Sequence, residues 1–319
     1  MAIMGGMGSL AARTELESLL RAIAERNSDP QAGIFGPGSA TWKINREAAL
    51  FLGAGRAALL QLAHPWVAAA IAEHSTAMDR PIVRFHNTFR IVYTMVYGSV
   101  GQAFEAARRL HTLHTGIQGE LPEAVGAWPR STRYEANEVG ALRWVWATLV
   151  DSAVLAYTAV LPLSAAEREQ YYGEMKTFAA LFGLSAGALP QDWKAFSSYC
   201  EVMFDSSELG VSAASRGMGQ RILSGAGSWI RPPRWYRALT AAWMPPRLRE
   251  GFGLAADDGA AEGARRWLPR VYGALPRAIR YVGPFQEAQA RLRGRRTGTL
   301  ARASSRFWIG QPEMPFAGE

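Results

Sequence analysis

The sequence has little cysteine: Cys200 is the single one among 319 residues. One cysteine cannot form an internal disulfide bond, and a zinc or iron–sulfur site built on several cysteines is excluded. The beginning of the chain also lacks the basic segment followed by an apolar segment that a secretory signal peptide requires. These absences predict a protein of the reducing cytoplasm.

Charged residues are also scarce, at 19%, whereas 49% of the residues are hydrophobic and 11 are tryptophans. This composition is typical of a globular protein with a large buried interior. Alternation of apolar and polar residues, the mark of strands, is rare, whereas apolar residues at helical spacing recur from about residue 10 to about residue 220. We therefore predict an all-α fold.

The length of 319 residues is near the upper limit at which a single hydrophobic core is usual. We expect an N-terminal leader and first helix over residues 1–44 and a helical core over residues 45–215. Residues 216–319 are expected to form an arginine-rich helical region that packs on this core.

An apolar run over residues 48–72 is long enough to raise the question of a membrane-spanning helix. Arg56 lies inside this run, and His64 and Pro65 divide it, because the residue before a proline is disfavoured in the α conformation. We therefore expect a buried helix over about residues 46–63 and a second, short helix that Pro65 opens. No transmembrane segment is predicted.

The next expected helix, over about residues 82–97, carries two different stripes. One has the spacing of a core face and consists of Phe85, Phe89, Val92 and Val96. Its neighbour is half polar and consists of Arg84, Asn87, Thr88, Ile91 and Met95. This mixture suits the wall of a pocket better than a face in open solvent.

Gly98 ends that helix and Ser99 can cap the following one, over about residues 100–116. The apolar face of this helix is expected to contain Ala103, Ala107, Leu110 and Ile117. His114 takes the place of an apolar residue in the middle of that face, and His111 lies at its border. Further along, Ser164 and Glu167 form the capping box of another helix.

The five histidines are clustered along the chain; they are His64, His74, His86, His111 and His114. They fit a haem pocket, a non-haem metal site, or histidines with structural roles only. A non-haem metal would need two or three imidazoles with a carboxylate. His111 and His114 supply two, but no H-E-x-x-H motif is present. A haem needs one imidazole on an apolar helix face, together with cationic or hydroxyl groups, and His114 fits that description.

The formal net charge of +8 comes mostly from arginines after residue 230, among them those of RLRGRR at 291–296. An arginine-rich segment of this kind either binds an anionic membrane surface or nucleic acid, or forms a solvated tail. No RNA-binding or zinc-finger motif accompanies the arginines, so no nucleic-acid partner is expected. Peripheral contact with a membrane stays open.

Five stretches occur in a characteristic order: GAGRAALLQLAHPWVAAAIAEHS, RFHNTFRIVYTMVYG, RRLHTLHTGIQG, LRWVWATLVDS and LSAAEREQYYGEM. Together they resemble the MpaB/rubber-oxygenase catalytic domain, also called the domain-of-unknown-function 2236 family. The resemblance covers roughly residues 45–215, with a weaker similarity in MPPRLREGFGL. It implies a globin-like all-α core that holds haem b, and members that cleave isoprenoid carbon–carbon double bonds with O2.

The same resemblance implies roles for individual residues. His114 of LHTLHTGIQG matches the proximal haem ligand, and Arg84 and Thr88 of RFHNT match the distal R-x-x-K-T motif. Asn87 stands where rubber oxygenases carry a lysine that can close the sixth haem position. Because an amide is a poor iron ligand, we expect an open or water-occupied distal site, unless His86 takes that place.

Other residues are expected around the cofactor. The resemblance implies that His64 and His74 lie in one wall of the site, where they meet haem propionates or helix ends, and His111 borders it. Glu73 is a candidate general base. For His64, His74 and Glu73 alike, the alternative is a structural hydrogen bond at a helix boundary, and that alternative is favoured. Arg56 is either a propionate partner or a core arginine.

Two further sets of residues leave alternatives open. Asp151 lies among apolar neighbours, where pairing with an arginine is favoured over catalysis. Several aromatic residues either line a hydrophobic substrate channel or belong to the core, and the core is favoured. They are Trp144, Trp146, Tyr171 and Tyr172. Trp146 is also a second departure from the family pattern, which has histidine in many members.

The sequence thus predicts a haem b-dependent oxygenase that acts with O2 on a hydrophobic, unsaturated small molecule of isoprenoid or lipid type. A haem-binding carrier or sensor without turnover is one alternative, because a globin-like pocket does not specify a reaction. A helical lipid-binding protein without a cofactor is the other.

Overall fold

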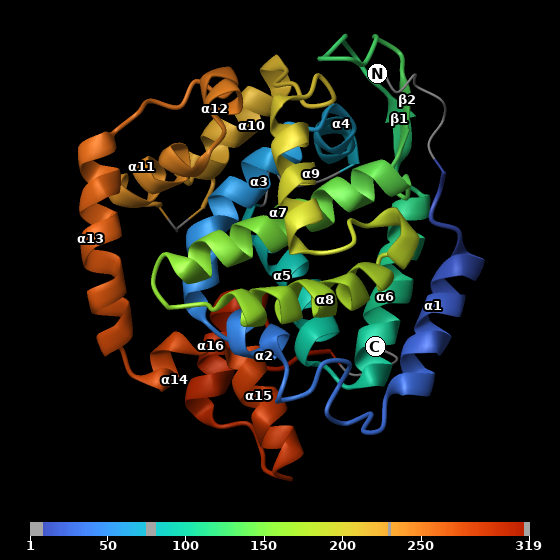
Figure 1. Ribbon diagram of the computed structural model, residues 1–319, viewed down its shortest axis with the longest axis vertical. Helices are drawn as coiled ribbons and strands as arrows, with labels where there is room; N and C mark the ends of the chain where they lie inside the picture. The colour runs from blue at the N-terminus through green and yellow to red at the C-terminus, as the bar shows by residue number, and fades with distance from the viewer. Residues whose placement is uncertain (1–8, 75–80, 229–230, 316–319) are drawn as a thin grey trace.

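The computed structural model describes residues 9–74, 81–228 and 231–315 (Figure 1). Within these ranges the chain forms sixteen α-helices and a single two-stranded sheet, so the predicted all-α class is confirmed. The first half consists of α1 (Arg13–Arg26), α2 (Ala40–Asn45), η1 (Ala48–Gly53), α3 (Ala54–Leu62), α4 (Pro65–His74), α5 (Pro81–Tyr97), α6 (Val100–Thr115), β1 (Gln118–Glu120), β2 (Arg133–Glu135) and α7 (Val139–Thr158). The second half consists of α8 (Ala165–Ala180), η3 (Ala186–Ala188), α9 (Trp193–Asp205), α10 (Ala213–Ser224), α11 (Arg234–Trp243), α12 (Pro246–Gly251), α13 (Asp258–Ala274), α14 (Arg277–Arg280), α15 (Gly283–Leu292) and α16 (Thr299–Ile309).

Helix α7 runs through the middle of the molecule, where it packs on η1, α3, α8 and α9 (Figure 1). Its indoles are fully buried and their N–H groups are satisfied. Trp144 donates to the Leu60 carbonyl oxygen and Trp146 to the Met175 carbonyl oxygen, each at 2.8 Å. Both tryptophans therefore belong to the core, as the sequence favoured.

By length and composition, α7 is the one helix in the described part of the chain that is apolar enough to cross a membrane. Within its most apolar window, 56% of the residues are buried inside the protein. Core burial therefore accounts for the hydropathy of this helix.

The segment before α3 differs from the sequence expectation. A single helix was expected over residues 46–63, but the chain forms three short elements, α2, η1 and α3. Ser39 ends the preceding loop early, because its hydroxyl accepts a hydrogen bond from the Trp42 amide and so caps α2. The predicted break at His64 is confirmed, since α3 ends at Leu62 and Pro65 opens α4.

Helices α5 and α6 form an antiparallel hairpin around Gly98 and Ser99. Ser99 and Gln102 make a reciprocal capping box at the start of α6, and the predicted box of Ser164 and Glu167 opens α8. The expected core stripe of α5 is also confirmed in part, since Phe85 and Phe89 pack on Phe51 of η1.

The sheet was not expected. Strands β1 and β2 pair antiparallel inside the connection between α6 and α7, with Gly119 opposite Tyr134. Tyr134 is buried, and α4 packs against both strands. This small sheet holds the end of α4 beside the residues that follow His114.

The last helices cover two parts of this core. Helix α13 packs on α11 at the left edge of Figure 1, and α15 and α16 pack on α5. Arg90 of α5 donates to the carbonyl oxygen of Ile309 at 3.1 Å, which ties α16 to the hairpin.

Candidate functional site

His114 lies in the last turn of α6 and is partly exposed. Burial of its ring, and to a lesser extent the neighbouring His111, lowers the pKa of the imidazole to about 4. A hydrogen bond with the Asn137 side chain opposes this shift. The ring is therefore neutral at physiological pH, which is the protonation state that binds a metal ion.

Asn137 in turn is fixed by α6. It is buried, and its amide donates to the His111 carbonyl oxygen at 3.2 Å and to the Thr115 hydroxyl at 3.1 Å. A histidine that ligates a metal usually has its second ring nitrogen held by such a partner. Asn137 was missed in the sequence because it lies in an irregular connection.

The two histidines of α6 differ from their expected placement. His111, expected at the border of the apolar face, is the more buried of the two, with 9% of its surface exposed. Its Nε2 lies 2.8 Å from the carbonyl oxygen of Ala11, which precedes α1. Because α1 packs on this side of α6, the buried face is turned toward His111, and His114 lies at its edge.

The half-polar stripe of α5 is only partly covered. Burial lowers the pKa of the Arg84 guanidinium, and Met95 is fully buried. Asn87 and Thr88, by contrast, are exposed. The expected pocket wall is thus open to solvent at these two residues. His86 faces another way, since its Nε2 lies 3.1 Å from the Phe307 carbonyl oxygen of α16.

Glu73 and His74 end α4 above the small sheet. The Tyr134 hydroxyl donates to Glu73 Oε2 at 2.5 Å, and His74 Nε2 lies 3.1 Å from the Gln118 carbonyl oxygen. Burial and the Glu73 carboxylate raise the pKa of Tyr134. A carboxylate with one firm donor and a partly exposed side chain can accept a proton from a bound molecule.

His64 is buried at the junction of α3 and α4, with 4% of its surface exposed. Its ring lies near the rings of Trp66 and Trp128, with centroids about 6 Å away. Its Nδ1 is a buried polar atom without a hydrogen-bond partner among the described residues. Burial lowers the pKa of His64 to about 4.

Arg56 of α3 is buried and has protein partners on several sides. Its Nη1 lies 2.6 Å from Asp151 Oδ2 and donates to the Ser152 hydroxyl, and its Nε donates to the Trp243 carbonyl oxygen. The favoured pairing of Asp151 with an arginine is confirmed. These partners compensate the buried charge of Arg56 without a further anion.

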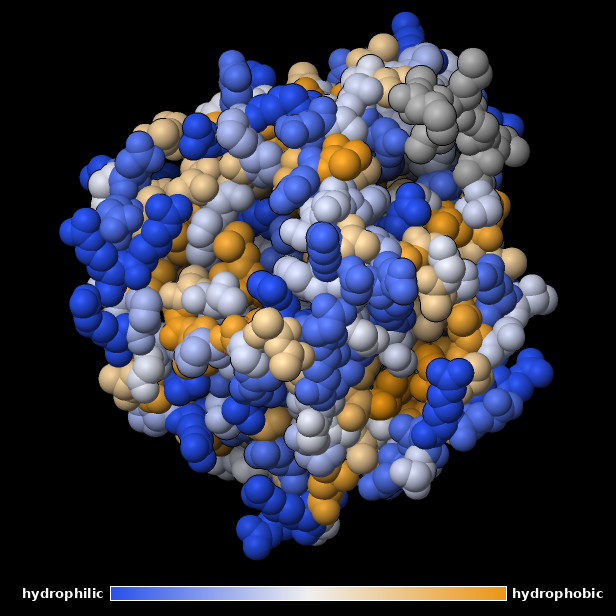
Figure 2. Space-filling model, viewed as in Figure 1, coloured by the Kyte–Doolittle hydropathy of each residue, from blue (hydrophilic) through white to orange (hydrophobic). Residues whose placement is uncertain are grey.

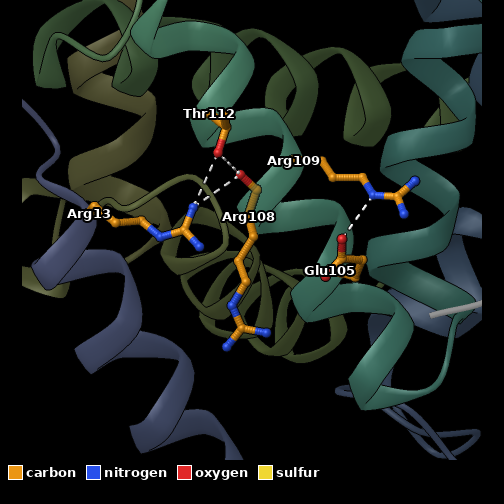
Figure 3. Close-up of a pocket in the computed structure, with 5 residues that line it drawn as sticks. All are labelled: Arg13, Glu105, Arg108, Arg109 and Thr112. Carbon is orange, nitrogen blue, oxygen red and sulfur yellow. Dashed lines mark hydrogen bonds and ion pairs between the residues drawn. The ribbon is translucent and has the colours of Figure 1, made fainter. Parts of the chain in front are cut away.

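A surface hollow and a buried cavity adjoin the helices of the α5–α6 hairpin. A surface hollow of about 340 Å³ between α1 and α6 is lined by Arg13, Glu105, Arg108, Arg109 and Thr112 (Figure 3). Its charges are paired, since Arg109 Nε lies 2.9 Å from Glu105 Oε1 and Arg108 Nη2 lies 2.9 Å from Glu17 Oε2. His114 does not line this hollow.

The second hollow is an apolar cavity of about 80 Å³ in the core, between α5, η1, α7 and α8. Phe89, Val92 and Tyr93 line it from α5, and Tyr171 lines it from α8. Tyr171 therefore borders a cavity, whereas Tyr172 is buried in the core and donates to the Pro190 carbonyl oxygen. The lining includes neither His114 nor Arg84.

Around His114 the described side chains offer one imidazole and not a set of metal ligands. Within residues 9–74, 81–228 and 231–315, no three His, Cys, Asp or Glu side chains converge on one point. A haem iron would need a single imidazole from the protein, and the imidazole of His114 is neutral and has a fixed partner.

The whole sequence points to a known family. Residues 42–293, well over half of the chain, match the family described as ER-bound oxygenase mpaB/B'/Rubber oxygenase, catalytic domain. The chain belongs to this family. No characterised protein and no solved structure shows significant similarity to it.

Membership in the mpaB/rubber oxygenase family confirms the resemblance and makes the protein an oxygenase by family. The match extends from α2 into α15, beyond the end expected near residue 215. The helical C-terminal region up to α15 is thus part of the catalytic domain. His114, Arg84 and Glu73 all lie inside the matched segment.

Proposed function

We propose that this family member is a haem b-dependent oxygenase that acts with O2 on a hydrophobic, unsaturated small molecule of isoprenoid or lipid type. The neutral, partly buried imidazole of His114 with its Asn137 partner carries this proposal. Haem b, when bound, supplies the redox-active iron at which O2 is activated.

His114 would hold the iron through the ring nitrogen that Asn137 does not engage. Because desolvation keeps the pKa of the imidazole at about 4, no proton competes for that nitrogen at neutral pH. Asn137 would fix the orientation of the ring through its own bonds to His111 and Thr115.

Arg84, Asn87 and Thr88 would contribute further polar groups from α5. Arg84 supplies a cation for a propionate or for a polar group of the substrate. Asn87 and Thr88 would supply hydrogen-bonding side chains where rubber oxygenases carry lysine and threonine, so no lysine of this segment would ligate the iron. The exposure of both side chains leaves that face accessible.

Glu73 would act as the proton acceptor. Its Oε2 already accepts the Tyr134 hydroxyl, which orients the carboxylate, and 56% of its side chain is exposed. A proton taken from a substrate carbon or hydroxyl would be held at the carboxylate until it is returned to product or solvent.

The test is a visible absorption spectrum of protein expressed with a haem precursor, recorded oxidised, reduced, and reduced with carbon monoxide. We expect a Soret band that carbon monoxide shifts and that His114→Ala removes. His111→Gln, on the same helix, is the matched control and should retain the band. If only His111→Gln lost the band, His111 and not His114 would be the iron ligand. A flat spectrum of the wild-type protein would contradict the proposal.

O2 consumption separates an oxygenase from a carrier or sensor. Haem-loaded protein with an unsaturated isoprenoid hydrocarbon should consume O2 steadily, and the saturated hydrocarbon should not support consumption. A haem spectrum without any turnover would favour the carrier, and co-purified lipid with a flat spectrum would favour the cofactor-free alternative.

A further inference from the structure

The formal charge of the chain is concentrated in its last helices. Residues 258–309, which form α13 to α16, contain eleven arginines, one aspartate and two glutamates, so their charge equals the +8 of the whole chain. The remaining residues are neutral in sum, and this segment contains no lysine. Such asymmetry within one chain indicates an anionic partner.

The same helices expose large hydrophobic side chains. Five of the ten exposed in the described part of the chain lie in this segment; they are Trp267 (36%), Val271 (49%), Ile279 (62%), Leu300 (58%) and Phe307 (40%). One exposed apolar side chain is ordinary. Their concentration among arginines is not expected of a merely solvated surface.

Helix α13 shows how the two kinds of residue are arranged. Its inner face packs on α11 and consists of Ala261, Ala264, Leu268 and Tyr272. The remaining surface carries Trp267 and Val271, one turn apart, beside Arg266 and Arg270. Helices that lie in a membrane interface have this composition, with aromatic and aliphatic side chains flanked by arginine.

Helix α14 continues this surface. It follows α13 directly and exposes Arg277 and Ile279, while its Arg280 turns inward to Glu47 at 3.0 Å. Both helices lie at the outer edge of the molecule, where hydrophilic residues and hydrophobic atoms alternate (Figures 1 and 2). Arg266 pairs with Glu262 at 3.0 Å, but both side chains are exposed and such a pair is weak.

We propose that the outer surface of α13 and α14 docks on a membrane that contains anionic lipids. We call this surface, made of Arg266, Trp267, Arg270, Val271, Arg277 and Ile279, the docking surface. Arginine binds lipid phosphates through its planar, weakly hydrated guanidinium, and tryptophan is favoured at the membrane interface. Nucleic acid would use the arginines but would gain nothing from Val271 and Ile279, which favours a lipid partner.

Docking and the proposed oxygenase activity are independent, since vesicle binding requires neither haem nor substrate. The full chain is sedimented with vesicles of phosphatidylcholine, with and without phosphatidylserine, at low and at high salt. We expect binding to the phosphatidylserine vesicles only, and weakening by salt because the charges are exposed.

Two double variants test the two kinds of residue. Arg270→Glu with Arg277→Glu should weaken binding at least about ten-fold, since each arginine near an anionic membrane is worth roughly five-fold. Val271→Ser with Ile279→Ser should also weaken it. The matched control is Arg216→Glu with Val202→Ser, an exposed arginine of α10 and a 68% exposed valine of α9, which should bind like the wild type.

Several results would overturn the proposal. The proposal fails if the wild-type protein does not sediment with anionic vesicles. It also fails if both double variants bind these vesicles as well as the control does. Two other partners, nucleic acid and a second copy of the chain, would each give a different result. Binding of an RNA oligonucleotide that only the arginine variant loses would assign the surface to nucleic acid. A dimer that both variants dissociate, without vesicle binding, would assign it to a second copy of the chain.

Discussion

The Tyr134 hydroxyl and the Glu73 carboxylate meet at 2.5 Å directly over the backbone of Gly119. A Cβ atom on Gly119 would lie 2.6 Å from Tyr134 Oη and 2.7 Å from Glu73 Oε2. Both distances are shorter than any van der Waals contact. The absence of a side chain at residue 119 is therefore what allows α4 to hold Glu73 against the sheet.

Gly119→Ala should consequently separate Tyr134 from Glu73. We expect a loss of stability of about 1–3 kcal/mol from overpacking, measured by urea unfolding. If Glu73 is the proton acceptor, turnover should also fall while the haem spectrum is retained. Gly116→Ala is the control, because its Cβ would meet only the Leu113 carbonyl oxygen at 3.6 Å. Equal effects of the two substitutions would show that this contact is unimportant.

Asn137→Ala tests the partner of His114. Loss of the group that holds a ligating histidine typically weakens metal binding about 10–100-fold. We expect that decrease in haem affinity, measured by haem transfer to apomyoglobin, together with a shifted Soret band. Thr115→Val removes one of the bonds made by Asn137 but leaves its contact with His114, and it should bind haem almost normally. The same haem loss in both variants would indicate a general structural role.

Sequence predicted those parts of the fold that local signals determine. The break at His64 and Pro65 and the capping boxes at Ser99 and Ser164 depend on residues within one helical turn. The face of α6 depends instead on α1, which arrives from far away in the chain and covers His111 through Ala11. Helical spacing alone therefore cannot tell which of His111 and His114, one turn apart at the edge of the buried face, is the more buried.

The sequence singled out the candidate site residues that lie on helices, and these remain predictions. His114, Arg84 and Glu73 stand out there by residue type, but their partners Asn137 and Tyr134 come from the connection between α6 and α7. That connection has no periodicity, and its two short strands pair only three residues each. Its contribution depends on contacts with residues far away in the chain, which the local sequence pattern does not predict.

His64 makes stability depend on pH in the acid range. Burial lowers its pKa from 6.5 to about 4, so the folded protein binds this proton more weakly than the unfolded chain. The corresponding stability is complete above pH 6.5 and is lost as the pH falls toward 4, by roughly 3 kcal/mol. Burial lowers the pKa of His114 in the same way, so urea unfolding of His64→Leu should lack only the share of this loss that comes from His64. His86→Gln, which alters a histidine at the α16 contact, should keep it.

Glu287 of α15 has the opposite dependence. Burial raises its pKa to about 7, although both carboxylate oxygens accept the Met314 amide. The folded protein therefore binds this proton more tightly, and the corresponding stability is lost as the pH rises from about 4.5 to about 7, by up to about 3 kcal/mol. Because His64 and His114 both gain stability over nearly the same interval, Glu287 offsets roughly the contribution of one histidine in the wild type. Glu287→Gln should therefore make stability rise more steeply with pH than in the wild type, and His64→Leu should make it nearly flat, because His114 still opposes Glu287. Parallel curves for the two variants would contradict both assignments.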